Sequence, residues 1–177
     1  MRAYKNQKGA GLLEVLVALM LLAVGVLGFV GLQLRAVEAT TEGVYRIQAM
    51  NLARDLSERI RVNRDNYLEV TPAGNNPLSY QKQITVAANQ KDSSKNCYTQ
   101  LCTAAETADF DVAQIKAKAD SFGMTFNLIP CEGAAMTRQC VYVAWNDTSA
   151  TKGADTTACT NGNGYRTDSQ CIVLEVY

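Results

Sequence analysis

Apolar residues run almost without interruption from Leu12 to Leu32, and Glu14 is the only charged residue among them. A helix of this length, rising about 1.5 Å per residue, spans the roughly 30 Å hydrocarbon core of a bilayer. Arg2, Lys5 and Lys8 precede the run. The positive-inside rule therefore predicts one membrane helix, with residue 1 in the cytoplasm and the C-terminal portion outside.

Glu14 is the feature of this run that needs an explanation. An ordinary secretory signal peptide would have a shorter apolar core, whereas a plain signal anchor fits the hydropathy. An ionised carboxylate facing lipid near the bilayer centre costs about 2.5 kcal/mol or more. We therefore expect Glu14 to have a partner, the alternative being a side chain that reaches to the interface.

Beyond the membrane run, apolar residues recur every three or four positions, which predicts an amphipathic helix. They are Tyr45, Ala49, Leu52, Leu56 and Ile60. The opposite face is rich in charge, and Asp55 and Arg59 have the spacing of a helical ion pair. The membrane helix is predicted to continue as one rod, which the turn-forming residues 72–77 would end.

A globular head is predicted after this turn. Tyr80 to Ala88 alternates around Ile84 and Val86, as an extended segment would. Thr103 and Glu106 form a capping-box pattern that predicts a short helix, which Gly123 would stop. The shared apolar face of that helix is predicted to consist of Val112, Ile115, Ala119 and Phe122.

Three further segments alternate between apolar and polar residues and predict strands of an antiparallel sheet with one buried face. Their apolar positions are Met124, Phe126 and Leu128; Val141, Val143 and Trp145; and Ile172, Leu174 and Val176. Packing this sheet on the apolar face of the N-terminal helix would bury both surfaces. The predicted fold class is therefore α+β.

Six cysteines, all outside the membrane run, predict three disulfides in an exported domain. They are Cys97, Cys102, Cys131, Cys140, Cys159 and Cys171. Six cysteines allow 15 pairings, and the simplest joins sequence neighbours: Cys97 with Cys102, Cys131 with Cys140, and Cys159 with Cys171. A four-cysteine zinc site or a redox motif is the alternative, but the sequence contains no Cys-x-x-Cys.

Little in the composition favours catalysis or nucleic-acid binding. The chain has 17 basic and 17 acidic residues and no histidine, so it lacks the commonest general base and a strongly basic surface. No nucleophile elbow or metal-ligand spacing is present. The polar segment 146–164 is predicted to be an exposed loop and a candidate contact surface. Asp147, Asp155 and Asp168 suggest calcium, but in no regular ligand pattern. We therefore predict no catalytic residues, metal or cofactor.

The residues around Glu14 resemble a prepilin leader. The segment from Lys8 to Leu19 reads KGAGLLEVLVAL, and in prepilins a peptidase cuts after a glycine, leaving glutamate fifth in the mature chain. The resemblance places the cut between Gly9 and Ala10, with Ala10 methylated. It also implies that Glu14 neutralises the N-terminal ammonium of an adjacent subunit and so sets the register. The resemblance implies that these two charges lie inside an apolar bundle of packed helices, where an ion pair is stronger than in water.

Two further segments, 25–33 and 49–63, are similar to PilV-type minor pilins. The resemblance implies a pilin fold with a leader at 1–9, a membrane and filament-core helix at 10–34, an amphipathic continuation at 35–65 and a head at 66–177. It implies a subunit that helps to prime type IV pilus assembly and supports twitching motility, adhesion and DNA uptake indirectly.

The implied partners are the major pilin, other minor pilins, the prepilin peptidase, the assembly platform and a tip adhesin, with no direct contact to nucleic acid. The implied location is the inner membrane, with the head in the periplasm, and then the extracellular pilus. Two alternatives stay open at this point: a minor pseudopilin of a type II secretion system, and a membrane-tethered periplasmic enzyme.

Overall fold

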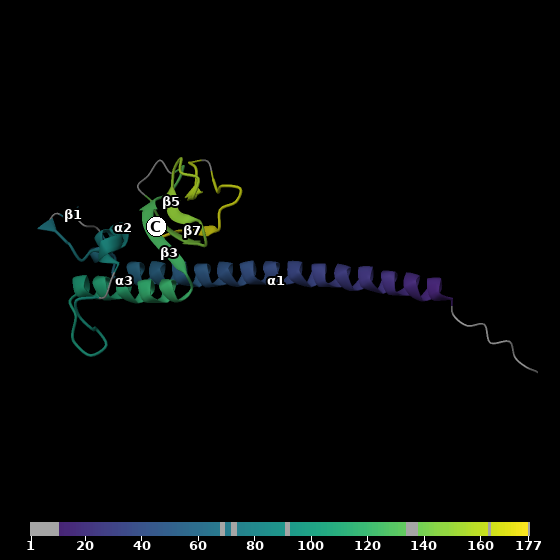
Figure 1. The fold of residues 1–177 in the computed structure, drawn as a ribbon. Coiled ribbons are helices and arrows are strands. Elements are labelled where there is room, and N and C mark those ends of the chain that lie inside the picture. Colours follow the sequence, from purple (N-terminus) through teal and green to yellow (C-terminus); the bar gives the residue numbers. More distant parts are fainter. Residues whose placement is uncertain are drawn as a thin grey trace, which may run out of the picture. The chain divides into compact units, whose positions relative to one another are not determined.

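The computed structural model describes residues 11–67, 70–71, 74–90, 93–133, 138–162 and 164–176. The chain divides into two compact units, Met1–Gly43 and Val44–Tyr177. Helix α1 (Leu12–Val62) begins in the first unit and ends in the second, which contains every other helix and strand of the described residues (Figure 1). These are η1 (Arg64–Asn66), β1 (Val70–Thr71), β2 (Gly74–Asn75), α2 (Tyr80–Thr85), η2 (Ala87–Asn89), α3 (Ala104–Ser121), β3 (Met124–Pro130), β4 (Gln139–Trp145), β5 (Ser149–Lys152), β6 (Ala158–Thr160) and β7 (Cys171–Glu175).

The C-terminal part of α1 buries the apolar stripe that the sequence predicts. Ala49, Leu52, Leu56 and Ile60 are all buried. The partly buried Tyr45 stacks on Trp145 of β4, with the ring centroids 6.4 Å apart. Spacings of three and four residues place these side chains on one face of the helix, which is why this face meets the core.

Helix α1 ends at Val62, before the predicted turn cluster at 72–77. Asn63 follows it, donating a side-chain hydrogen bond to the Ala104 carbonyl and accepting one from Asn66. Asparagine side chains that bond to nearby groups compete with helix formation, so the helix stops here without a proline. Within the cluster, β2 pairs with β1, and residues 72 and 73 lie outside the described residues.

The predicted capping box on α3 is confirmed. The Thr103 hydroxyl accepts a hydrogen bond from the Glu106 amide, and the Glu106 carboxylate accepts one from the Thr103 amide. At the other end, Gly123 has φ +65°, a left-handed conformation that suits glycine. Val112, Ile115 and Ala119 are buried, and Phe122 packs against the same core.

The predicted antiparallel sheet is confirmed, with strand order β3-β4-β7. Phe126 pairs with Val143, which in turn pairs with Ile172 across the other neighbour. One face of this sheet packs with α1, α2 and α3 in the main hydrophobic core. The fold is therefore α+β, a long N-terminal helix combined with a C-terminal antiparallel sheet and three disulfides.

The prediction that only one face of the sheet is buried is wrong for β4. Tyr142 and Ala144 point away from the helices, yet neither is exposed. They belong to a second hydrophobic cluster with Cys140, Cys159 and Cys171, and Ala150 of β5 completes it. The parallel pair β5 and β6 and two disulfides cover this face, so every residue of β4 after Gln139 is buried.

The segment from Tyr80 is helical, which corrects the extended conformation that its alternation predicts. The Ser79 hydroxyl caps α2 by accepting a hydrogen bond from the Lys82 amide. Tyr80, Gln83 and Ile84 are buried at helical spacing. The N-cap and this three-and-four spacing outweigh the short run of alternating β-branched residues.

A polar network joins three helices inside the head. Figure 1 shows α3 beside the C-terminal part of α1, and Arg59 of α1 pairs with Asp111 of α3. The hydroxyl of Tyr80, on α2, donates to the other oxygen of Asp111. Asp111 is buried, so its two oxygens depend on these donors. Burial and the Asp111 hydrogen bond raise the pKa of the Tyr80 hydroxyl.

The structure pairs the cysteines as Cys97–Cys102, Cys131–Cys140 and Cys159–Cys171, the pairing of sequence neighbours that the spacing favours. Cys97–Cys102 closes a short turn before α3. The other two disulfides lie beside the second cluster, where Cys159 is fully buried.

We predict that Asp111→Ala lowers the free energy of unfolding by about 2–3 kcal/mol, because it removes the buried carboxylate that accepts from both the Tyr80 hydroxyl and the Arg59 guanidinium. Tyr80→Phe removes only one donor and should cost about 1 kcal/mol. Urea unfolding of the full chain in detergent, followed by fluorescence of the single tryptophan, the buried Trp145, measures both values. The matched control is Asp65→Ala, because the side chain of Asp65 is 95% exposed. An equal loss of unfolding free energy in Asp65→Ala and Asp111→Ala would contradict the role of the network.

We also predict that the double change Cys159→Ser and Cys171→Ser destabilises the head more than Cys97→Ser and Cys102→Ser. The Cys159–Cys171 bond closes the longer loop, with a sequence separation of 12 against 5, and its loss also places hydroxyls in the second cluster. The expected loss is about 3 kcal/mol for the first pair. The same fluorescence assay compares the two variants, and the reverse order would show that β5 and β6 stay packed without the disulfide.

Candidate functional site

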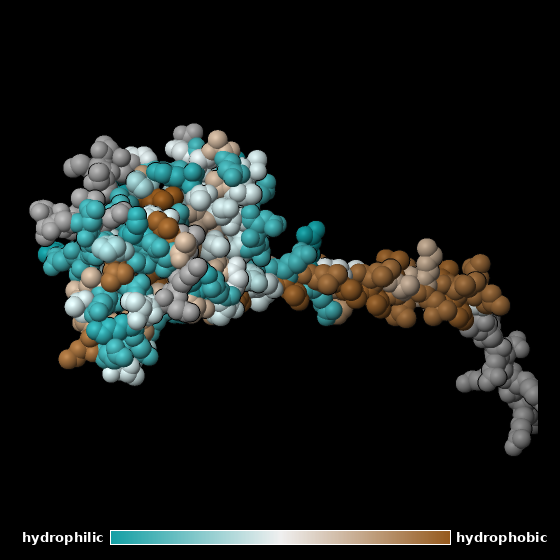
Figure 2. Space-filling view, turned by 60° about the vertical axis from the view of Figure 1, so that its left-hand side comes forward, coloured by the Kyte–Doolittle hydropathy of each residue, from teal (hydrophilic) through white to brown (hydrophobic). Residues whose placement is uncertain are grey.

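The N-terminal part of α1 presents a continuous apolar surface to its surroundings. Residues 15–34 include no charged side chain, and Figure 2 shows them as a nearly unbroken brown band. Leu12 is 80% exposed, Met20 70% and Leu27 71%. By length and composition α1 is able to cross a membrane, and the most apolar window of the helix is not buried by other described residues.

Glu14 lies in the first turn of α1 and is exposed. Its backbone amide donates a hydrogen bond to the Gly11 carbonyl over 2.9 Å. The first amide groups of a helix have no intrahelical acceptor and carry partial positive charge, so an acidic residue in this turn is favourable. Glu14 thus places a negative charge at the N-terminal end of a long apolar surface. Gly9 and Ala10, the predicted processing site, lie outside the described residues.

The predicted exposed loop at 146–164 is partly wrong. Ser149–Lys152 and Ala158–Thr160 form β5 and β6, and Ala158, Cys159 and Thr160 are buried. Between the strands, residues 154–157 are exposed. The sequence suggests a loop because these strands are short and the residues around them are rich in Thr, Asn and Asp. Their pairing depends on the disulfide and on β4 beneath them.

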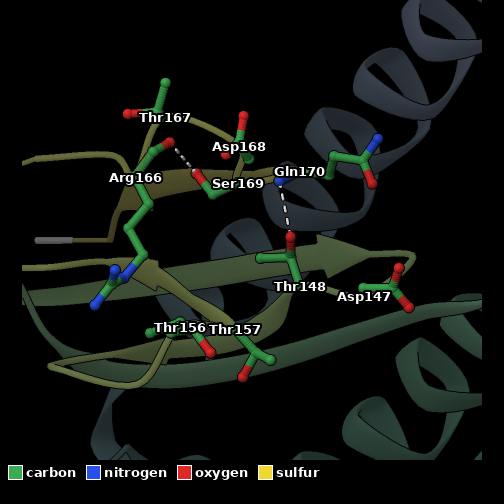
Figure 3. A pocket seen from close by; sticks show the side chains of 10 residues that line it. Asp147, Thr148, Thr156, Thr157, Arg166, Thr167, Asp168, Ser169 and Gln170 are labelled. Atoms are coloured by element: carbon green, nitrogen blue, oxygen red, sulfur yellow. Dashed lines mark hydrogen bonds between the residues drawn. The ribbon is translucent and has the colours of Figure 1, made fainter.

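A hollow of about 600 Å³ lies beside this segment, lined mainly by polar residues (Figure 3). Hydrogen bonds between the lining residues connect the loops to one another. The Gln170 amide donates to the Thr148 hydroxyl, and the Ser169 hydroxyl donates to the Arg166 carbonyl. Arg166 also donates to the carbonyls of Gly153 and Ala154. These contacts hold the Cys159–Cys171 loop against β5.

The structure brings only part of the suggested calcium set together. Asp147 and Asp168 line the hollow from different segments, and Asp155 is not among the lining residues. No group of three or more metal-ligating side chains forms within the described ranges. The Tyr142 hydroxyl, whose pKa burial raises, lies in the second cluster with Thr160 as a hydrogen-bond partner. These contacts account for the fold of the segment and point to no reaction.

The sequence predicts the loop closed by Cys97 and Cys102, but the exposure of the apolar side chains in this loop was not predicted. Tyr98 is 78% exposed and Leu101 95% exposed. The base of the loop is held by the capping box of α3 and by an ion pair between Lys95 and Glu106 (3.1 Å). An apolar residue inside a disulfide loop of four residues could have indicated this exposure, because so short a loop cannot fold over its own side chains.

Two family models match the chain. The model of a prokaryotic N-terminal methylation motif matches residues 4–30, and the model of a family described as type IV pilin Tt1218 matches residues 31–113. Over residues 31–113 the chain is similar to the type IV pilins, and the methylation motif that precedes this stretch is the one found in prepilins. No curated protein and no solved structure gives a significant match.

These two matches give the exposed surface of α1 a context. The methylation motif covers Glu14 and most of the uncharged stretch, and it implies processing by a prepilin peptidase and incorporation into a pilus. An apolar helix of this length is consistent with a membrane anchor before assembly. The second match runs through α2 and the Cys97–Cys102 loop into α3, so the family likeness includes both α1 and part of the head.

The charge of Glu106 should make the base of the Cys97–Cys102 loop sensitive to acid. The Thr103 amide, followed by the Lys95 ammonium, lowers the pKa of the Glu106 carboxyl. A lowered folded-state pKa gives stability that is present above the unfolded value of about 4.3 and is lost as the pH falls through the folded value. We predict that the difference in urea midpoint between the wild type and Glu106→Gln is constant above about pH 5 and narrows below about pH 4. A difference that stays unchanged at low pH would contradict this role.

Proposed function

We propose that this type IV pilin is a minor pilin of the PilV type, which joins other minor pilins in priming pilus assembly and is incorporated with the major pilin. The observation that carries the proposal is the uncovered apolar surface of α1 with Glu14 in its first turn, inside the match to the methylation motif. The likeness of segments 25–33 and 49–63 to PilV-type pilins supports the subtype. Twitching motility, adhesion and DNA uptake would depend on it indirectly.

The maturation step in this proposal is cleavage between Gly9 and Ala10, followed by methylation of Ala10. Residues 1–9 are then the leader, and the membrane holds residues 10–34 with the head on the periplasmic side. Positive charge at Arg2, Lys5 and Lys8 supports this orientation. The assembly platform would draw the subunit out of the inner membrane into the filament.

Glu14 has a specific role in this account. Moving α1 from lipid into a bundle of neighbouring helices keeps its apolar residues away from water. The new ammonium of a subunit would also enter this bundle, where an unpaired charge is costly. A neighbouring Glu14 carboxylate provides the opposite charge, and attraction between the two is strong at low dielectric. The pair would align adjacent subunits and so fix their register.

The charge of Glu14 also indicates where in the filament the subunit lies. A subunit at the extreme tip has no neighbouring ammonium ahead of it, so its Glu14 would have no partner there. We therefore place this pilin beside or beneath another minor pilin, with a tip adhesin as a candidate neighbour. A minor pseudopilin of a secretion system would use the same helix, and the match to a type IV pilin family over residues 31–113 favours the pilus.

We predict that Glu14→Gln is processed normally but is recovered in sheared filaments at least tenfold less than the wild type, because the neighbouring ammonium loses its partner. Quantitative mass spectrometry of membranes and filaments from cells with the native assembly machinery measures both fractions. The matched control is Glu38→Gln, since Glu38 also lies on α1 and is exposed beside Arg35. Recovery of Glu14→Gln at the wild-type level would contradict the pairing.

A further inference from the structure

The three disulfides of the head each join cysteines that follow one another in the sequence. The separations are 5, 9 and 12 residues, and no cysteine is left unpaired. Of the 15 ways to pair six cysteines, only this one joins the first to the second, the third to the fourth and the fifth to the sixth. The order of the cysteines along the chain is thus sufficient to specify the pairing.

Two of these disulfides are covered in the finished head. Cys159 is fully buried, Cys140 is 5% exposed and Cys171 is 8% exposed. All three belong to the second hydrophobic cluster, to which β5 and β6 also contribute. An enzyme oxidises a thiol only when the sulfur can reach the enzyme's own disulfide. These cysteines must therefore react before β5 and β6 cover β4.

The register of the sheet excludes a wrong pair between neighbouring strands. Cys171 lies opposite Ala144, four positions along β4 from Cys140. At about 3.4 Å per residue this offset separates Cys140 and Cys171 by roughly 13 Å, whereas the Cα atoms of a disulfide lie within about 7 Å of each other. A chain that joined these two cysteines before folding could not form the sheet. The pairing must therefore be correct before the sheet closes.

Short loops bring the native partners together without the rest of the head. In the first loop the Thr99 amide donates to the Asn96 carbonyl, and in the hairpin of the second the Cys131 amide donates to the Arg138 carbonyl. Closing a short loop also costs less conformational entropy than closing a long one. Cysteines that are neighbours in the sequence thus meet more often in the unfolded chain than distant ones do.

The order of export favours the same pairing. In the proposed orientation the head follows α1 out of the cytoplasm, so Cys97 and Cys102 are exported first and Cys171 last. Synthesis at about 5–20 residues per second separates the arrival of successive pairs by roughly 1–6 s. An oxidant that reacts within this interval closes each pair before the next one is exposed.

We infer that a periplasmic dithiol oxidase introduces the three disulfides one pair at a time, in the order of export, and that the head needs no disulfide isomerase. In each cycle a thiolate of the chain attacks the disulfide of the oxidase and forms a mixed disulfide. The thiolate of the next cysteine then attacks the chain sulfur of this bond. The oxidase leaves as a dithiol, having taken up the two electrons and two protons of the chain thiols. The inference rests on the proposed function only through the export of the head.

Peptide mapping of the alkylated, unreduced chain tests this inference in two strains, one without the periplasmic oxidase and one without the periplasmic isomerase. Loss of the oxidase should lower the amount of fully oxidised head about tenfold, because uncatalysed disulfide formation is slow. Loss of the isomerase should leave the three native pairs unchanged. Mispaired cysteines in the second strain, or full oxidation in the first, would overturn the inference.

The same samples keep the inference separate from the proposed function. Intact mass reports whether residues 1–9 have been removed, and this cleavage does not depend on how the cysteines pair. An uncut chain with native disulfides would contradict the proposed function and leave the inference intact. A cut chain with mispaired cysteines would have the opposite meaning.

An extra cysteine inside the last loop tests the order of pairing directly. Thr167 is exposed and lies between Cys159 and Cys171. In cells without the isomerase, Thr167→Cys should divert about half or more of Cys159 to position 167, because the thiol there is exported first and closes a shorter loop. The matched control, Thr167→Ser, should retain the three native pairs. Native pairing in Thr167→Cys would show that the folded head directs the pairing, and would contradict the inference.

Discussion

The structure depends on one constraint: residues 15–34 form an uncharged helical surface that other described residues of the chain do not cover. Each large side chain on such a surface gains roughly 1.5–3 kcal/mol when it leaves water. Lipid meets this demand for a single chain, and parallel helices of other subunits meet it in a filament. The same surface thus suits both a membrane anchor and a filament core, and the proposed pairing of Glu14 would make the second environment selective.

The head must be stable without help from this surface, and its construction reflects its small size. A modest domain buries a limited apolar area. Here β4 is buried on both faces, with α1, α2 and α3 on one side and with β5 and β6 on the other. Two disulfides, Cys131–Cys140 and Cys159–Cys171, lie on the second side, where the strands are short and polar. Covalent bonds thus reinforce the side of the sheet that has the smaller apolar cluster.

Features set by neighbouring residues were predictable from the sequence, and features set by distant contacts were not. The capping box at Thr103 and the turn at Gly123 follow from local hydrogen bonding and backbone geometry. The hydrogen bond from the Tyr80 hydroxyl to Asp111 joins residues 31 positions apart, and burial of Tyr142 depends on strands whose own pattern is weak. Glu14 is identifiable from its position, but its proposed partner belongs to another molecule, so no single chain can display the pair.

Intact-protein mass spectrometry tests the central claim, that α1 belongs to a processed filament subunit, most directly. Chain recovered from native membranes and sheared filaments is compared between the wild type and a strain without prepilin peptidase. The account predicts loss of Met1 to Gly9 only when the peptidase is present, with one methyl group on Ala10 and a mass six protons below that of the reduced chain. An uncut chain in both strains would contradict it, and the apolar helix would then be an ordinary membrane anchor.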